Sequence, residues 1–371
     1  MNLSTREHKT ATSKSRTMSL AHWRDILLIG TLVVSGLFAG SSFLIPLTLA
    51  LLTFVLIVAI SDRVAAVEIA GVRVPQWLGY LIGSIAVLVA LFAIMMVLGS
   101  QATQLARAIP VYETQMDSAL ARIGALIGEE AVEFLKVNVI QIDMSRLAIT
   151  AFGGASSLFS TFLLICLYVA FMIVERAAMG RKLLLAASDE KLQHEINTVT
   201  TEISQSLQRY LGVKTFISLL TAVFSYVVFR LLGLEFAETW AVLTFALNFI
   251  PSIGSVLAVI LPSLVALLQF ESIAPFLVVA LGCGSVQFVI GNFIDPALTG
   301  RTLNISTLMV MLTLTFWTML WGIAGAFLSV PLTVCLMIVF SQIPATRPIA
   351  ILMSKDGRLA TDDAPTQVEE N

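Results

Sequence analysis

The chain has 371 residues, of which 57% are hydrophobic and 12% are charged, and its formal net charge is −2. Soluble proteins average roughly 45 to 50% apolar and about 25% charged residues, so this composition is typical of a polytopic membrane protein whose main partner is the lipid bilayer. A nucleic-acid partner is not expected, because such a binder needs a clustered basic face that this charge balance does not indicate. The apolar runs predict an all-α fold with six to eight membrane segments.

Three membrane segments are predicted within residues 26–99. They follow a polar tail, 1–25, which carries no cleavage pattern and is expected to stay in the cytoplasm. The first two apolar runs, 26–40 and 43–60, are short for two spans, and the Gly40-Ser41-Ser42 step between them predicts a tight hairpin. The third run, 78–98, is a plain span.

Residues 100–152 differ in character, because acidic and basic residues interrupt apolar ones that recur at helical steps. This pattern predicts an amphipathic helical segment outside the membrane. It either caps a substrate path, or pairs with a neighbouring subunit of a homo-oligomer, or lies on the membrane surface. A fourth span, 153–174, then leads to a cytoplasmic amphipathic segment, 175–209, whose early basic residues agree with the positive-inside rule.

The transport core is predicted within 210–342, where two apolar segments are too long for single spans. Segments 237–268 and 305–341 would measure about 48 and 54 Å as continuous helices, against a hydrocarbon core of about 30 Å. Helix-breaking residues sit in the middle of both segments: Pro251, Gly254, Gly322 and Gly325. We interpret the segments as two inverted re-entrant hairpins whose tips meet near the bilayer midplane and enclose the transport path. Eight kinked spans are the alternative, and in either case the tail, 343–371, ends in the cytoplasm.

Polar residues at membrane depth provide the candidate site. The sequence G-N-F-I-D-P-A-L-T-G-R at 291–301 is expected to break the helix, and its charged residues would be costly facing lipid. Asp295 either binds a proton or coupling ion, or caps a helix, or pairs with Arg301. Amides either coordinate the solute or serve as caps and helix contacts. The residues predicted to form the solute or ion path are Asn248, Pro251, Gly254, Gln287, Asn292, Asp295, Gly300, Arg301, Gly322 and Gly325.

Enzyme chemistry is not expected. The three histidines, His8, His22 and His194, lie outside the predicted spans, so no intramembrane zinc site or serine–histidine pair can be assembled. No G-x-x-x-x-G-K-[ST] sequence occurs, which excludes direct use of ATP through that motif. We therefore expect no cofactor, no metal and no catalytic residue.

Three segments carry a family resemblance. The sequences N-F-I-P-S-I-G, G-N-F-I-D-P-A-L-T-G-R and W-G-I-A-G-A-F-L-S-V-P-L resemble signature segments of the AI-2E (autoinducer-2 exporter) family. The family often has an aromatic residue at the place of Ser252, and leucine-histidine-proline where this chain reads Leu303-Asn304-Ile305-Ser306.

The resemblance implies a multi-pass secondary transporter of the bacterial inner membrane, with both termini in the cytoplasm. It would export a small solute, such as an autoinducer-2-like molecule, or exchange ions, using a proton or sodium gradient. The alternatives are a passive channel, a sodium/proton antiporter or a membrane scaffold that does not transport.

Overall fold

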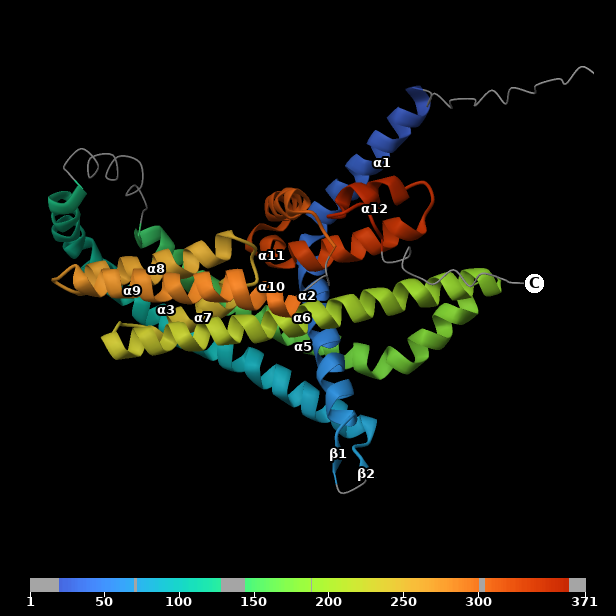
Figure 1. The fold of residues 1–371 in the computed structure, drawn as a ribbon, viewed down its shortest axis with the longest axis horizontal. Coiled ribbons are helices and arrows are strands. Elements are labelled where there is room, and N and C mark those ends of the chain that lie inside the picture. The colour runs from blue at the N-terminus through green and yellow to red at the C-terminus, as the bar shows by residue number, and fades with distance from the viewer. Residues whose placement is uncertain (1–19, 70–71, 128–143, 188, 300–303, 360–371) are drawn as a thin grey trace, which may run out of the picture. The chain divides into compact units, whose positions relative to one another are not determined.

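The computed structural model describes residues 20–69, 72–127, 144–187, 189–299 and 304–359 (Figure 1). Within these ranges nearly every residue is helical, which confirms the predicted all-α fold. The chain divides into two compact units, Met1–Leu44 and Ile45–Asn371, and α1 lies in the first. The helices are α1 Leu20–Ala39, α2 Ser41–Ala65, α3 Gln76–Ile127, α5 Met144–Ala186, α6 Glu190–Leu232, α7 Ala237–Leu247, α8 Ile253–Gln269, α9 Ala274–Val289, the π-helix η1 Ile290–Ile294, α10 Asp295–Thr299, α11 Thr307–Gln342 and α12 Arg347–Met353.

Six stretches among the described residues are long and apolar enough to cross a membrane. They are Ser41–Ala65, Gln76–Ser100, Phe159–Arg176, Glu190–Leu232, Ala274–Leu298 and Thr307–Gln342. Three shorter apolar helices, Leu27–Ala39, α7 and α8, add to this set. The chain is therefore a multi-pass membrane protein, as its composition predicts.

The predicted tight hairpin at Gly40 is wrong. Gly40 N donates to Gly36 O at 2.9 Å, and Leu44 N donates to Gly40 O at 2.9 Å, so helical hydrogen bonding continues through this residue. Glycine permits a turn but does not impose one, and in apolar surroundings a turn would leave backbone groups without hydrogen bonds. A short antiparallel pair, β1 Glu68–Ile69 and β2 Val72–Arg73, then joins α2 to α3.

The third span and the first part of the predicted amphipathic segment, as far as Ile127, form one helix, α3, of 52 residues, whereas 128–143 of that segment lie outside the described residues. Tyr112 and Met116, in the C-terminal half of α3, pack in a hydrophobic cluster that includes Phe229 and Trp240. The hydroxyl of Tyr112 donates to Glu235 Oε2 at 2.6 Å. Burial raises the pKa of Tyr112 above its ordinary value, and the bond to Glu235 adds to the shift, so this donor stays protonated. This part of α3 therefore packs on the core.

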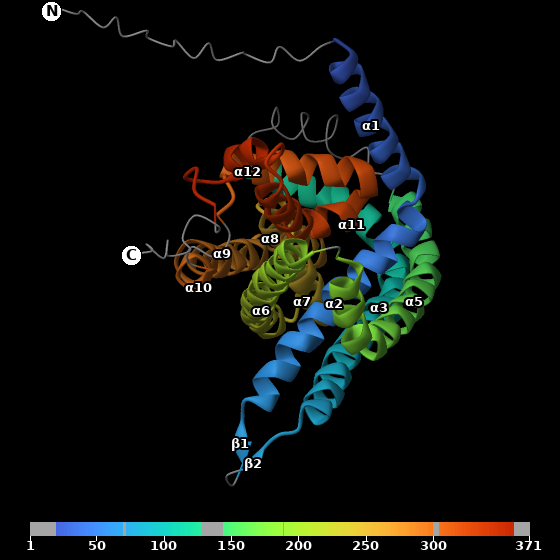
Figure 2. The ribbon, with the colours of Figure 1, turned by 90° about the vertical axis from the view of Figure 1, so that its right-hand side faces the viewer.

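From Glu190 onward, the second predicted amphipathic segment runs directly into the next span, as predicted, within the 43 residues of helix α6. Asp189 caps its N-terminus by accepting a hydrogen bond from Leu192 N at 2.7 Å. Gly233 ends it in the left-handed conformation, with φ of 72°. In Figure 2, α6 and α9 are seen nearly end-on, bundled with α7 and α8.

Segment 237–268 is broken, as predicted, into a helical hairpin of α7 and α8, which we call the first hairpin. The turn lies at residues 248–252, and its last residue, Ser252, has a φ of 58°. Two residues later the chain passes very close to the end of α7. A Cβ added to Gly254 would lie 1.7 Å from Leu247 O, so only glycine fits this approach.

Segment 305–341 is also broken, because α11 has a non-helical residue, Gly322, with φ of 61° and ψ of −139°. The two arms of α11 form the second hairpin. A Cβ added to Gly325 would lie 1.8 Å from Trp317 O, the same kind of close approach as at Gly254. Both predicted breaks, and the need for these two glycines, are thus confirmed.

The hairpin tips meet. The rings of Phe249 and Phe327, each beside a break, stack with their centroids 4.8 Å apart. Ile250 packs with Leu314 and Ala326 of α11. In Figure 1 the first hairpin approaches from the left, where α6 ends, whereas α11 and α12 lie to the right. The tips therefore approach each other, as the inverted-hairpin interpretation requires, while their depth in the bilayer stays a prediction.

The helix does not break at 291–299, contrary to the prediction. Residues Ile290–Ile294 form a π-helix that continues α9, and α10 follows at once. Asp295 N donates to Ile290 O, the wide bond of a π turn. The wide turn shifts the hydrogen bonding without ending the helix, and Pro296, which lacks an N–H, follows it as the second residue of α10.

Candidate functional site

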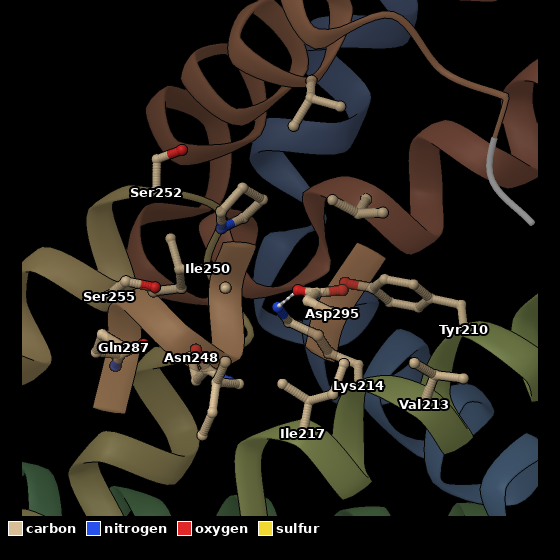
Figure 3. A pocket seen from close by; sticks show the side chains of 15 residues that line it. Tyr210, Val213, Lys214, Ile217, Asn248, Ile250, Ser252, Ser255, Gln287 and Asp295 are labelled. Atoms are coloured by element: carbon tan, nitrogen blue, oxygen red, sulfur yellow. Dashed lines mark ion pairs between the residues drawn. The ribbon is translucent and has the colours of Figure 1, made fainter. Parts of the chain in front are cut away.

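A pocket of about 390 Å³ lies where α6, the turn of the first hairpin, the α9–α10 helix and both arms of the second hairpin come together (Figure 3). Its apolar wall includes Ile217, Ile290, Val310 and Val330. Its polar residues are Tyr210, Lys214, Asn248, Ser252, Ser255, Gln287 and Asp295. Elements far apart in sequence thus build one small, mixed polar and apolar chamber within the bundle of spans.

An ion pair between Lys214 and Asp295 dominates the electrostatics of the pocket. The distance from Lys214 Nζ to Asp295 Oδ2 is 3.6 Å, and the two side chains are 16% and 31% exposed. Figure 3 shows the ammonium and the carboxylate directed toward each other across the chamber. Each charge lowers the cost of placing the other away from bulk water, so neither is uncompensated.

Helix α6 positions three of the lining side chains on one face. Tyr210, Lys214 and Ile217 are spaced by four and three residues, which places them above one another along a helix. Tyr210 is buried, and in Figure 3 its hydroxyl points toward the carboxylate of Asp295. The π-helix places Asp295 directly after its wide turn, facing α6.

Two amides line the other side of the chamber. Asn248 is 5% exposed, and its Nδ2 donates to Ser218 Oγ at 3.2 Å, so it links the first hairpin to α6. Gln287, on α9, has a buried Nε2 atom without a hydrogen-bond partner in the described part of the chain. A buried donor left unpaired costs free energy, so Nε2 is available to a polar group entering the pocket.

Four predicted path residues come together in this pocket: Asn248, Pro251, Gln287 and Asp295. Gly254, Gly322 and Gly325 do not line it, and instead shape the two breaks.

Asn292 is not brought to the site, because its exposed side chain donates to Phe288 O of its own helix at 2.9 Å. Gly300 and Arg301 lie outside the described residues. The pairing of Asp295 with Arg301 thus stays a prediction, whereas Lys214 is an ion-pair partner that the structure shows.

Lys214 and Tyr210 line the pocket and were not singled out by the sequence analysis. The signal for Lys214 was present, because it is the one charged residue between Leu211 and Phe229. Tyr210 stood in the apolar repeat of the amphipathic segment, which gave no reason to single out its hydroxyl. No group of three or more potential metal-ligating His, Cys, Asp or Glu side chains occurs among the residues that the structure describes.

Two broken hairpins, together with an ion pair between α6 and α10 in the pocket, are typical of one class of protein, the polytopic α-helical membrane transporter. The family model of the AI-2E family transporter matches residues 26–345, so the chain belongs to the AI-2E transporter family. This membership confirms the resemblance read from the three signature segments.

Relatives with assigned names agree with a transport role. The chain is 30% identical over 341 residues to the AI-2 transport protein TqsA of Escherichia coli K12, covering 89% of this chain and 95% of that one. It is 30% identical over 324 residues to a Haemophilus influenzae protein named as a candidate transport protein, covering 84% and 88% of the two chains. The candidate transport protein YhhT of Escherichia coli K12 is 27% identical over 334 residues, covering 88% and 93%.

Proposed function

We propose that the chain is a secondary transporter that moves a small solute through the pocket between its hairpins, driven by a proton or sodium gradient. The observation that carries this proposal is the Lys214–Asp295 ion pair, 3.6 Å between charged atoms, in the wall of a chamber of about 390 Å³. Charged residues within membrane spans are costly, and they commonly mark ion and substrate pathways.

The pair offers a physical route for coupling. The carboxylate of Asp295 can be neutralised by the ammonium of Lys214, by a proton or by a sodium ion, and each of these competes with the other two. Arrival of a proton or sodium ion therefore frees Lys214 and weakens the attraction between α6 and α10. Because both helices line the pocket, this exchange changes the packing around the bound solute.

The size and lining of the pocket favour a compact polar solute. A chamber of about 390 Å³ with hydroxyl, amide and charged groups is at the small end of ligand pockets, which run from about 300 to 1,000 Å³. One relative is named as an AI-2 transport protein, so autoinducer-2 is the first solute to test, with export as the first direction.

Sodium/proton antiport is a second candidate function. The observation in its favour is that Lys214 and Asp295 are the only charged side chains among the described residues that line the pocket. Exchange of one cation for another at a single carboxylate requires no organic solute. Antiport would appear as proton movement driven by a sodium gradient in the absence of any solute.

The decisive experiment uses the full chain reconstituted in proteoliposomes with imposed proton or sodium gradients. Autoinducer-2 flux and internal pH are measured together, with Asp295→Asn as the variant and Asn292→Ala as the matched control outside the pocket. A coupled carrier concentrates autoinducer-2 at the expense of one gradient, and Asp295→Asn abolishes this. Flux that follows only the solute gradient would instead show that the protein is a passive channel. The absence of any solute or ion flux would favour a membrane scaffold that does not transport.

We also propose that the protein lies in the bacterial inner membrane with both termini in the cytoplasm. Support comes from the basic residues that follow the fourth span, including Arg176, Arg181 and Lys191. Single cysteines at Glu130 and Lys191 test the orientation with an impermeant thiol reagent in intact cells. Glu130→Cys should be labelled from outside, whereas labelling of Lys191→Cys would reverse the topology.

A further inference from the structure

The chain after α12 forms a structured contact with the segment that precedes α11. Ile305 and Ser354 form an antiparallel bridge, in which Ser306 N donates to Met353 O at 2.9 Å and Lys355 N donates to Asn304 O at 3.2 Å. Ile305 and Ser354 are 8% and 7% exposed. We call residues 354–359 the C-terminal clasp.

Asn304 is the centre of this contact. Its Nδ2 donates to Asp356 Oδ1 at 2.5 Å and to Arg358 O at 2.8 Å. Within the clasp, Gly357 N donates to Ser354 Oγ at 2.9 Å, which closes a turn, and Leu359 is buried at 4% exposed. One side chain thus bonds to two parts of this turn.

The clasp connects the two ends of the second hairpin. Asn304 lies just before the first arm of the second hairpin, and the clasp follows its second arm through α12, which packs against α11. The hairpin is therefore tied at its base, the end opposite its tip. The tie adds to the packing of α12 and α6 against α11.

We propose that the C-terminal clasp fixes the separation of the two arms of the second hairpin at their base, so that this hairpin behaves as one rigid body, with Asn304 as the positioning residue. The clasp is not a simple continuation of a helix, because α12 ends at Met353 and the bridge is made by extended backbone. The acidic partner in the contact is Asp356, and the basic side chains nearest to it along the chain are Lys355 and Arg358.

The acidic group of the clasp, Asp356, stays ionised near neutral pH. The hydrogen bond from Asn304 lowers the pKa of Asp356 below its ordinary value of 3.8, and the backbone N–H of Arg358 adds to this shift. A lowered folded-state pKa gives stability that is present above the ordinary value and is lost as the pH falls through the folded value. Asp356 is therefore ionised at physiological pH, the state in which its oxygen accepts the bond from Asn304.

Hydrogen–deuterium exchange of the full-length protein in lipid nanodiscs tests the proposal, measured at the first turns of α11, residues 307–313. Asn304→Ala removes both side-chain bonds and should speed exchange there roughly threefold to tenfold, as expected for the loss of one or two hydrogen bonds. Lys355→Ala is the matched control, because the structure records only its backbone N–H in the clasp. Equal exchange in the two variants would overturn the proposal.

A disulfide rescue separates this tie from a general loss of folding. Ile305 and Ser354 form the non-hydrogen-bonded kind of antiparallel pair, whose Cα atoms lie about 4.5 Å apart, within disulfide range. Ile305→Cys and Ser354→Cys are combined with Asn304→Ala in a chain whose Cys166, Cys283 and Cys335 are replaced by alanine.

Oxidation should return exchange at 307–313 to within about twofold of the parent, and reduction should raise it again. Oxidation without such a return would refute the clasp as the element that holds the arms. Neither readout involves a solute, so the test stands even if coupled transport fails.

Discussion

The first hairpin turns at Ser252 and the second at Gly322, and both residues have positive φ angles, 58° and 61°. Glycine adopts this conformation at little cost, whereas an L-residue pays roughly 1–3 kcal/mol. Ser252 lines the pocket and Gly322 does not. Strain is thus retained at the break that presents a side chain to the site, and it is absent at the break that only turns the chain.

The hairpins also differ in what they offer the pocket. The first hairpin and its turn contribute the amide of Asn248 and the hydroxyls of Ser252 and Ser255, whereas the second contributes two valines. The first hairpin therefore supplies polar recognition, and the second supplies an apolar wall. Their shared feature is the glycine that lets each tip close against a carbonyl oxygen.

The largest expected effect tests that shared feature. Gly254→Ala and Gly325→Ala place a Cβ at 1.7 and 1.8 Å from a backbone oxygen, so each tip must open. Each should destabilise the protein by more than about 3 kcal/mol, measured as thermal unfolding in detergent. Gly284→Ala, where no atom lies within 4 Å of the added Cβ, is the control. If only one of the two substitutions strongly lowered the stability, the two tips would not be structurally equivalent.

The second largest effect is expected from substitutions in the Lys214–Asp295 ion pair of the pocket. Lys214→Met or Asp295→Asn alone removes the ion pair and should cost about 1–3 kcal/mol, less than for a fully buried pair because Asp295 is 31% exposed. The double variant should recover most of this stability but not coupled transport. Additive losses in the double-mutant cycle would show that the two groups do not interact.

A smaller effect compares how the two hairpins are held at their bases. Tyr112→Phe removes the 2.6 Å bond to Glu235 near the base of the first hairpin and keeps the ring in its apolar cluster. We expect a loss of about 1 kcal/mol in thermal unfolding. Faster hydrogen exchange should be confined to α7 and α8. Spread of that effect into α11 would mean that the bases are not braced independently.

The smallest effect concerns the strained serine. Ser252→Gly relieves the positive φ but increases the freedom of the unfolded chain, so stability should change by less than about 1 kcal/mol. Solute affinity should fall nonetheless, because the hydroxyl leaves the pocket. Unchanged solute affinity in a transport assay would show that Ser252 does not contact the solute. The strain at Ser252 would then not distinguish the first hairpin from the second.

Much of this architecture could be predicted from the sequence, because it depends on local rules. The lengths of segments 237–268 and 305–341 exclude single spans, and the positions of Gly254 and Gly325 indicate where the chain must turn back. Asp295 could be singled out from the sequence because a charged side chain is costly within a membrane. Lys214 could not be identified as its partner, because an ion pair between distant helices depends on how the helices pack and rotate, which sequence periodicity does not indicate.

The stretch 291–299 shows the opposite case. Gly291, Asn292 and Pro296, close together in sequence, predict a helix end, yet the chain stays helical because one wide turn adapts the hydrogen bonding. Likewise, Gly40 permits a turn that does not form. Breaker residues thus predict a reversal correctly where segment length also demands it, as at Pro251 and Gly322.

The geometry of the site depends on the number of residues in the π-helix Ile290–Ile294. Each residue of an α-helix advances the side-chain direction by about 100°, so the extra residue in the wide turn sets the angular phase of everything after it. Deleting one residue there would turn the carboxylate of Asp295 about a quarter of a revolution away from α6. All residues and contacts of α9 could be preserved in such a deletion, and Lys214 would still lose its counter-ion.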